Sequence, residues 1–242
     1  MQNTSATYQE IVSGSHWFET ALRIYTDSSN YQILYEDNII SAKISRPGMS
    51  DSKPSVGGAL ASTLDLEIVT PSFTIPRMAK IITYFKAVNS EEASGWFPSG
   101  TWWIDTRSVA AGDFSTTTIT AFDAMMFGEQ EYPDTVHSWP YLDKNVVAEI
   151  ASTIGVTVDS RTNDFLSSAY MIELPADYTM REVLEHIAAM YCGNFVITAE
   201  NKLLFVPLYG LEPEDSITGR YLKDEGSTDA LQFGEEDWYI LV

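Results

Sequence analysis

Cysteine and basic residues are scarce in this chain of 242 residues, and long apolar runs are missing. The single cysteine, Cys192, excludes a disulfide bond within the chain. No apolar run approaches the roughly 20 residues that a membrane-spanning helix needs, so we expect no membrane span. The N-terminal residues MQNTSATYQEIV lack the basic start and apolar core of a signal peptide, so we expect synthesis in the cytoplasm without one.

Acidic residues outnumber basic ones, with 34 Asp and Glu against 14 Lys and Arg, and the formal net charge is −20. Affinity for nucleic acid depends on Lys and Arg that neutralise phosphates, so specific nucleic-acid binding is disfavoured. Two interpretations of the charge remain open. A negatively charged wall would let DNA pass without binding it, or the charge simply keeps the protein soluble.

No arrangement of chemically reactive side chains stands out. The three histidines, His16, His137 and His186, have no second histidine or cysteine at metal-ligand spacing, and His186 is predicted to lie on a helix surface. Cys192 is predicted to be a buried structural thiol, because no histidine stands in a recognised arrangement with it. We therefore expect no cofactor, no metal, no catalytic residue and no enzymatic activity.

Acidic residues do fall close together at two places, Asp123 with Glu129 and Glu131, and Glu235 with Glu236 and Asp237. Glycosidases need two carboxylates that face one bond. In a chain with 34 acidic residues such neighbours also arise by chance, so they define no site.

Residues 1–127 carry strand patterns separated by turn residues. Leu64, Leu66 and Ile68 alternate with polar residues, as in a half-buried strand. The patterns predict a hairpin over 31–46 around the residues EDN, strands over 59–69, 78–88 and 112–127, and a hairpin over 95–109 that turns at Pro98 and Gly100. Residues SVGGAL are predicted to be a flexible lead-in. Together these elements predict a β-sandwich or small barrel.

After Phe127 the pattern changes to helices. A helix is predicted from an Asp143 cap to Gly155, and a second over 177–193, with a capping box of Thr179 and Glu182 and a left-handed stop at Gly193. A hairpin over 194–208 follows. The predicted fold is mainly β, with a barrel-like or sandwich domain at 1–127, a small α+β domain at 128–210, and a segment at 211–242 for which a return to the β body is one expectation.

The stretch GWFPSGTWWIDTR is the strongest candidate for an interaction strip. Aromatic rings beside a carboxylate can form a sugar-binding platform. The alternative is that the rings fill the core while the acid and the arginine pair on one strand face. The strip consists of Trp96, Phe97, Trp102, Trp103, Asp105 and Arg107.

Ordered phrases cover most of the chain, from about residue 8 to 208: YQEIVSGSHWFETALRI, KPSVGGALASTLDLEI, IPRMAKI, FPSGTWWIDTR, TITAFDAM and YTMREVLEHIAAMYCGNFVIT. Together they resemble the N-terminal region of bacteriophage and prophage tail-tip proteins, the baseplate hub family. The same region forms the front part of tail-associated lysins in long-tailed phages of Gram-positive bacteria.

The resemblance implies a structural protein of the virion tail tip, made in the host cytoplasm. It implies a homotrimeric ring that closes the tail tube and forms a conduit for DNA ejection, with tube, distal tail and tape-measure proteins as partners. It also implies barrel-like β domains that mimic the tube subunit. Relatives often continue into a further barrel-like section or a lytic module, and no such module follows in this sequence, so we expect a fragment or a compact member. The alternative function is a module that binds or cleaves cell-wall glycan through the Trp96–Arg107 strip.

Overall fold

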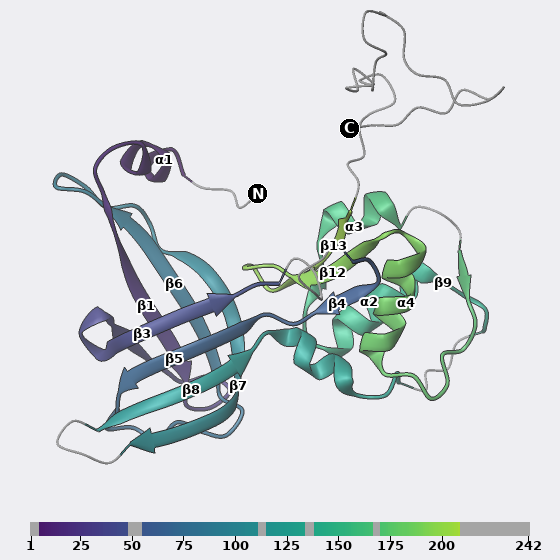
Figure 1. Ribbon diagram of the computed structural model, residues 1–242, viewed down its shortest axis with the longest axis horizontal. Coiled ribbons are helices and arrows are strands. Elements are labelled where there is room, and N and C mark those ends of the chain that lie inside the picture. The colour runs from purple at the N-terminus through teal and green to yellow at the C-terminus, as the bar shows by residue number, and fades with distance from the viewer. Residues whose placement is uncertain (1–4, 48–54, 111–114, 134–137, 167–169, 209–242) are drawn as a thin grey trace, which may run out of the picture. The chain divides into compact units, whose positions relative to one another are not determined.

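The computed structural model describes residues 5–47, 55–110, 115–133, 138–166 and 170–208 (Figure 1). A short helix, α1 (Ala6–Ser13), precedes the first strand and was not predicted from the sequence. Several predictions concern residues outside these ranges: His137, the neighbouring acids Glu235, Glu236 and Asp237, and the segment 211–242.

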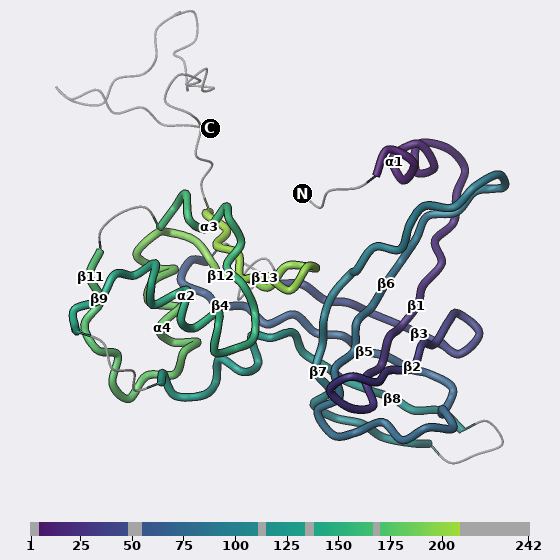
Figure 2. Tube along the Cα trace, turned by 180° about the vertical axis from the view of Figure 1, so that it is seen from behind, coloured from purple at the N-terminus to yellow at the C-terminus, as the bar shows by residue number. Residues whose placement is uncertain are grey.

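The larger sheet has seven strands in the order β2-β1-β6-β7-β8-β5-β3, and every neighbouring pair is antiparallel. Figure 1 shows β3, β5 and β8 side by side, and Figure 2, from behind, shows β1 beside β6. The strands are β1 (Trp17–Tyr25), β2 (Tyr31–Tyr35), β3 (Ile39–Ser45), β5 (Thr63–Val69), β6 (Lys80–Val88), β7 (Phe97–Ala110) and β8 (Thr116–Phe122).

This sheet is curled, because its two edge strands are consecutive in the sequence. Only η1 (Glu36–Asn38) separates β2 from β3, and four residue steps span at most about 14 Å. Six flat strand spacings would separate the edges by about 29 Å. No ladder joins β2 to β3 in the described ranges, so the curled sheet is not a closed barrel.

The predicted hairpin over 31–46 is therefore wrong. β2 forms its hairpin with β1, and β3 pairs with β5. Alternation of apolar residues indicates which face a strand buries, but it does not indicate its partner. The mainly β fold class with an α+β portion is confirmed, as are the strands at β5 and β6.

The inner face of the curled sheet forms one apolar core. Leu64, Leu66 and Ile68 of β5 are buried there, as their alternation predicted. Ile39 and Ile44 of β3 pack against this core. Every other strand of the sheet contributes buried residues to it: Leu22, Ile24, Leu34, Ile81, Trp102, Ile104, Ile119 and Ala121.

The predicted turn at Pro98 and Gly100 is also wrong, because both lie inside the 14-residue strand β7. Proline lacks the N–H of a regular ladder and is accepted at bulges, and the pairing of β6 with β7 shifts register beside Pro98. A Cβ on Gly100 would lie 2.4 Å from the indole of Trp102. Gly100 thus makes room for a buried ring and does not turn the chain.

The second sheet is four-stranded, in the order β10-β13-β12-β4, and packs with helices around a core of its own. We call this sheet and its helices the lobe. Its strands are β4 (Gly58–Leu60), β10 (Thr157–Val158), β12 (Gly193–Ile197) and β13 (Lys202–Pro207). The β12–β13 hairpin confirms the prediction for 194–208. The other elements of this lobe are η2 (Ala124–Glu129), α2 (Asp143–Thr153), α3 (Ser160–Phe165), α4 (Met180–Met190) and the short pair β9 (Tyr141–Leu142) and β11 (Met171–Ile172).

Residues SVGGAL supply a strand to this lobe and are not only a lead-in. Strand β4 pairs in parallel with β12, with Ala59 opposite Phe195. The Asn194 side chain supports β4, because its Oδ1 accepts from Gly58 N at 2.8 Å and its Nδ2 donates to the Ser55 carbonyl at 2.9 Å. The lobe thus includes a strand from residues 58–60, and the domain boundary at Phe127 stays a prediction.

Both predicted helices are present, but not all of their ends are as predicted. The capping box of Thr179 and Glu182 is confirmed at the start of α4. Asp143 is the first residue of α2, preceded by Leu142 as N-cap. The left-handed residue after α4 is Cys192, with φ of 51°, and Gly193 is already the first residue of β12. No helix in the described ranges combines the length and apolarity that crossing a bilayer requires.

Candidate binding site on the outer face of the curled sheet

Three neighbouring strands, β2, β1 and β6, turn aromatic and basic side chains away from the core. In β1 the core residues Leu22 and Ile24 alternate with Ala21, Arg23 and Tyr25, which point to the opposite face of the sheet, where Ala21 is covered by its neighbours. The register of the three strands places the outward residues in rows. We call this surface the aromatic-cationic face; it comprises Ala21, Arg23, Tyr25, Tyr31, Ile33, Tyr35, Lys80, Tyr84 and Lys86, with Trp96 from the segment before β7.

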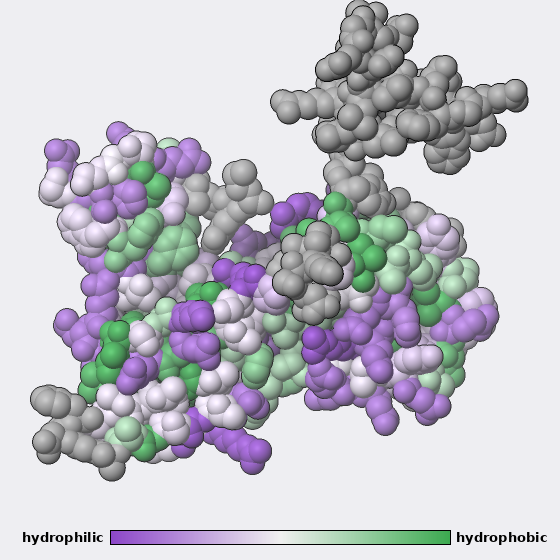
Figure 3. Space-filling model, in the orientation of Figure 1, coloured by the Kyte–Doolittle hydropathy of each residue, from purple (hydrophilic) through white to green (hydrophobic). Residues whose placement is uncertain are grey.

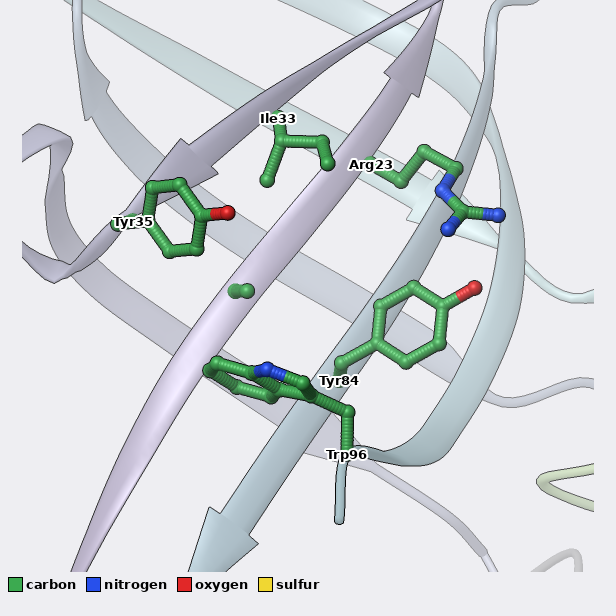
Figure 4. A pocket seen from close by; sticks show the side chains of 6 residues that line it. Arg23, Ile33, Tyr35, Tyr84 and Trp96 are labelled. Atoms are coloured by element: carbon green, nitrogen blue, oxygen red, sulfur yellow. The ribbon is translucent and has the colours of Figure 1, made fainter.

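A small pit lies in the middle of this face, because one small residue stands between large ones. Ala21 is directly opposite Tyr35 on one side and Tyr84 on the other. Ile33, Arg23 and Trp96 complete the lining, and the cavity volume is about 150 Å³. Figure 4 shows the five large side chains arranged around the pit.

Arg23 is fixed in place by tyrosine rings. Its guanidinium carbon lies 4.4 Å from the ring centroid of Tyr31 and 5.2 Å from that of Tyr84, which is cation–π geometry. Hydrogen bonding with Tyr25 raises the pKa of Arg23, and electrostatic interactions with Tyr84 and Tyr31 add to the increase. The Nε atom is buried and has no hydrogen-bond partner in the described part of the chain. A buried unpaired donor costs about 1–3 kcal/mol, so the position of this arginine needs an explanation.

Two lysines extend the positive charge on either side of the pit. Lys80 Nζ lies 5.0 Å from the Tyr25 ring, and Lys86 Nζ lies 4.8 Å from the Trp96 ring. Lys86 is also paired with Glu19 at 2.7 Å. This face therefore carries local positive charge on a chain whose net charge is −20.

The other half of the same outer surface is different in character. The outward residues of β5 and β8 include Asp65, Glu67, Thr118 and Thr120, and Thr120 Oγ1 lies 3.3 Å from Asp65 Oδ1. On the side drawn in Figure 3, hydrophobic and hydrophilic residues are intermixed. The aromatic and cationic side chains are thus concentrated on one half of the sheet.

The residues of the predicted strip do not lie together on one surface. Trp96 joins the aromatic-cationic face, where its ring centroid is 6.5 Å from that of Tyr35. Phe97 packs instead against Tyr8 of α1 and Phe85 of β6. Trp102 is 1% exposed and donates from Nε1 to Thr83 Oγ1 at 3.0 Å.

The remaining strip residues lie on the C-terminal side of Trp102. Trp103 packs against the core of the lobe and meets Phe127 edge to face at 5.2 Å. Asp105 and Arg107 are exposed, Arg107 donates to the Ile75 carbonyl, and no ion pair within the described ranges joins the two. An interaction role for the strip stays a prediction, and Trp96 is the member that shares a surface with the pit.

Two other predicted residues have different environments. His186 is exposed and contacts Tyr178, in agreement with a helix surface position. Cys192 is exposed, so the prediction of a buried thiol is wrong. Cys192 lies in the turn between α4 and β12, beyond the buried stripe of the helix.

Asp123 has a structural role and does not form a site with Glu129 and Glu131, because Asp123 is buried and the two glutamates are exposed. Its carboxylate accepts from Ser62 N at 2.8 Å and from Met125 N at 3.0 Å, which joins the residue before β5 to the start of η2. Burial raises the pKa of Asp123, whereas Glu129 and Glu131 are exposed. No group of three metal-ligating residues occurs in the ranges that the structure describes.

The fold is similar to that of a prophage tail protein of known structure. The chain is similar to the 43 kDa tail protein of prophage MuSo2 from Shewanella oneidensis, with a TM-score of 0.57 and 12% identity over 81% of this chain and 57% of that one. It is also similar to a tail protein from Neisseria meningitidis MC58, with a TM-score of 0.48 and 14% identity over 78% and 50% of the two chains. A third match is prophage tail protein gp18 from Listeria monocytogenes EGD-e, with a TM-score of 0.47 and 11% identity over 85% and 56%.

The first of these matches confirms, at the level of fold, the resemblance that the sequence phrases indicated. This chain spans little more than half of the length of that tail protein. Neither a protein-family model nor a curated protein matches the sequence.

Proposed function

We propose that the chain is a structural component of a phage or prophage tail, located at the tail tip, where it closes the tube and forms part of the conduit for DNA. The observation that carries the proposal is the likeness of its fold to the MuSo2 tail protein over 81% of the chain. The curled antiparallel sheet also supports the proposal, because a curved sheet can form part of the wall around a central channel.

Charge supports the conduit part of the proposal. A net charge of −20 repels DNA, so a wall built from this chain would not retain the genome during ejection. Within this proposal the protein acts as a homotrimer in contact with tube, distal tail and tape-measure proteins, and it works through interfaces and not through catalysis.

The test is to disrupt the gene in the phage or prophage that encodes the chain and to image the particles by negative-stain electron microscopy. We expect absent tails or tails without a closed tip, and restoration when the full chain is supplied in trans. Complete, infectious particles without the chain would overturn the proposal. Release of soluble fragments from peptidoglycan by the purified protein would contradict its non-enzymatic part.

A further inference from the structure

We propose that the pit on the aromatic-cationic face binds an acidic segment of a different protein, which inserts one apolar side chain above Ala21 and places an Asp or Glu carboxylate against Arg23. The inference goes beyond the tail-tip role and does not depend on it, because it rests on the geometry of the pit alone.

The size of the pit favours a single side chain over a free small molecule. Its volume is about 150 Å³, whereas pockets for small-molecule ligands are typically about 300–1,000 Å³. Ala21 forms a floor between two tyrosines in cross-strand register, so an inserted side chain would contact rings on both sides.

The composition of the rim is that of a protein interface. Tyr31, Ile33, Tyr35 and Trp96 are 42%, 42%, 54% and 40% exposed although all are large and apolar or aromatic. Tyr, Trp and Arg are the residues most enriched among those that dominate binding energy at protein interfaces. Grouped exposure of this kind indicates an interaction surface, whereas isolated exposed apolar residues do not.

Charge indicates the chemistry of the partner. Arg23 is held by two rings and has no carboxylate partner in the described part of the chain, whereas nearby Lys86 is already paired with Glu19. A planar guanidinium that is fixed before binding loses little conformational entropy when it pairs with a carboxylate. A different protein is favoured over a second copy placed face to face, because a two-fold interface would set Arg23 and Lys80 against the same cations of the other chain.

The first experiment exposes the purified full chain to a display library of short random peptides. We expect the enriched peptides to share a large apolar residue next to Asp or Glu. Ala21→Leu, which fills the pit without changing any charge, should abolish the enrichment. Thr118→Leu is the matched control, because it adds an apolar side chain at an exposed position on the other half of the same sheet, and it should leave the enrichment unchanged.

The second experiment measures the affinity of one enriched peptide by calorimetry. Arg23→Gln should weaken binding roughly tenfold or more, as expected for a charge-assisted hydrogen bond. Replacing the acid of the peptide by its amide should weaken binding to the wild-type chain similarly and should have little further effect on Arg23→Gln. Circular dichroism of each variant confirms that the fold is retained.

Three outcomes would overturn the proposal. The enriched peptides could lack acidic residues, or their binding could be insensitive to Ala21→Leu. Sedimentation could also show that the wild-type chain self-associates and that Ala21→Leu does not, which would make a second copy the occupant. The first two results do not bear on the tail-tip role, and the third bears only on how the chain contacts its own copies. The particle images test the tail-tip role separately.

Discussion

Gly193 is present because its neighbours leave no room for a side chain, and this can be tested by adding one methyl group. A Cβ at this position would lie 2.3 Å from Cζ of Phe205 and 2.5 Å from the carbonyl oxygen of Val206. Non-bonded carbon atoms normally approach to about 3.5–4.0 Å. Phe205 is 1% exposed and packs against the rings of Phe165 and Phe195, each with a centroid distance of 5.3 Å, so its ring has no space to withdraw.

We therefore expect Gly193→Ala to lower the free energy of unfolding by about 3 kcal/mol, at the upper end of the usual range for overpacking. For a chain of this size that corresponds to a fall in Tm of roughly 6–12 °C. Thermal unfolding followed by circular dichroism measures the change. Gly95→Ala is the control, because a Cβ there meets nothing within 4 Å, and we expect its effect to stay below about 0.5 kcal/mol. Equal Tm values for the two variants would refute the reasoning.

Three further predictions concern single side chains. Cys192→Gly should raise the free energy of unfolding by up to about 1 kcal/mol, because glycine adopts the left-handed φ of 51° without steric cost, and the native thiol should react fully with a maleimide without denaturant. Arg161 lowers the pKa of Asp159 to about 2, so this carboxylate contributes stability above its ordinary pKa of 3.8 that is lost as the pH falls towards 2. Asp159→Asn should flatten that part of the pH dependence in urea titrations. Trp102→Phe should cost about 1–2 kcal/mol in the same assay, because it removes the hydrogen bond to Thr83 and leaves a gap in the core.

Local periodicity was sufficient to predict the elements whose burial pattern lies within one short stretch. Strand β5, with alternating Leu64, Leu66 and Ile68, is one example, and helix α4 with its capping box is another. The hairpin of β12 and β13 also follows from its own residues. In each case the sequence signal and the structural determinant are the same few residues.

The errors arose where the role of a residue depends on a contact with another part of the sequence. Gly100 and Gly193 were interpreted as turn residues, but each makes room for a ring, that of Trp102 or of Phe205. The partners of β2 and β3 depend on how the whole sheet curls, which no local pattern specifies.

The pit was missed for a similar reason. It forms only when strands β2 and β6 place Tyr35 and Tyr84 beside Ala21. Its one local signal was the outward series Glu19, Ala21, Arg23, in which a small residue stands between two long charged ones.

Strand β4 ties the lobe to the curled sheet more firmly than a single linker would. The chain leaves the curled sheet after β3, contributes β4 to the lobe, and returns two residues later at β5, before it enters the lobe again after β8. A protease that cuts the crossing after β8 would leave the rest of the lobe held by its pairing with β4, which stays covalently joined to the curled sheet on both sides. Release of the lobe by a single nick would therefore require β4 to separate from β12, and residues 128–208 expressed alone would lack one strand of their own sheet.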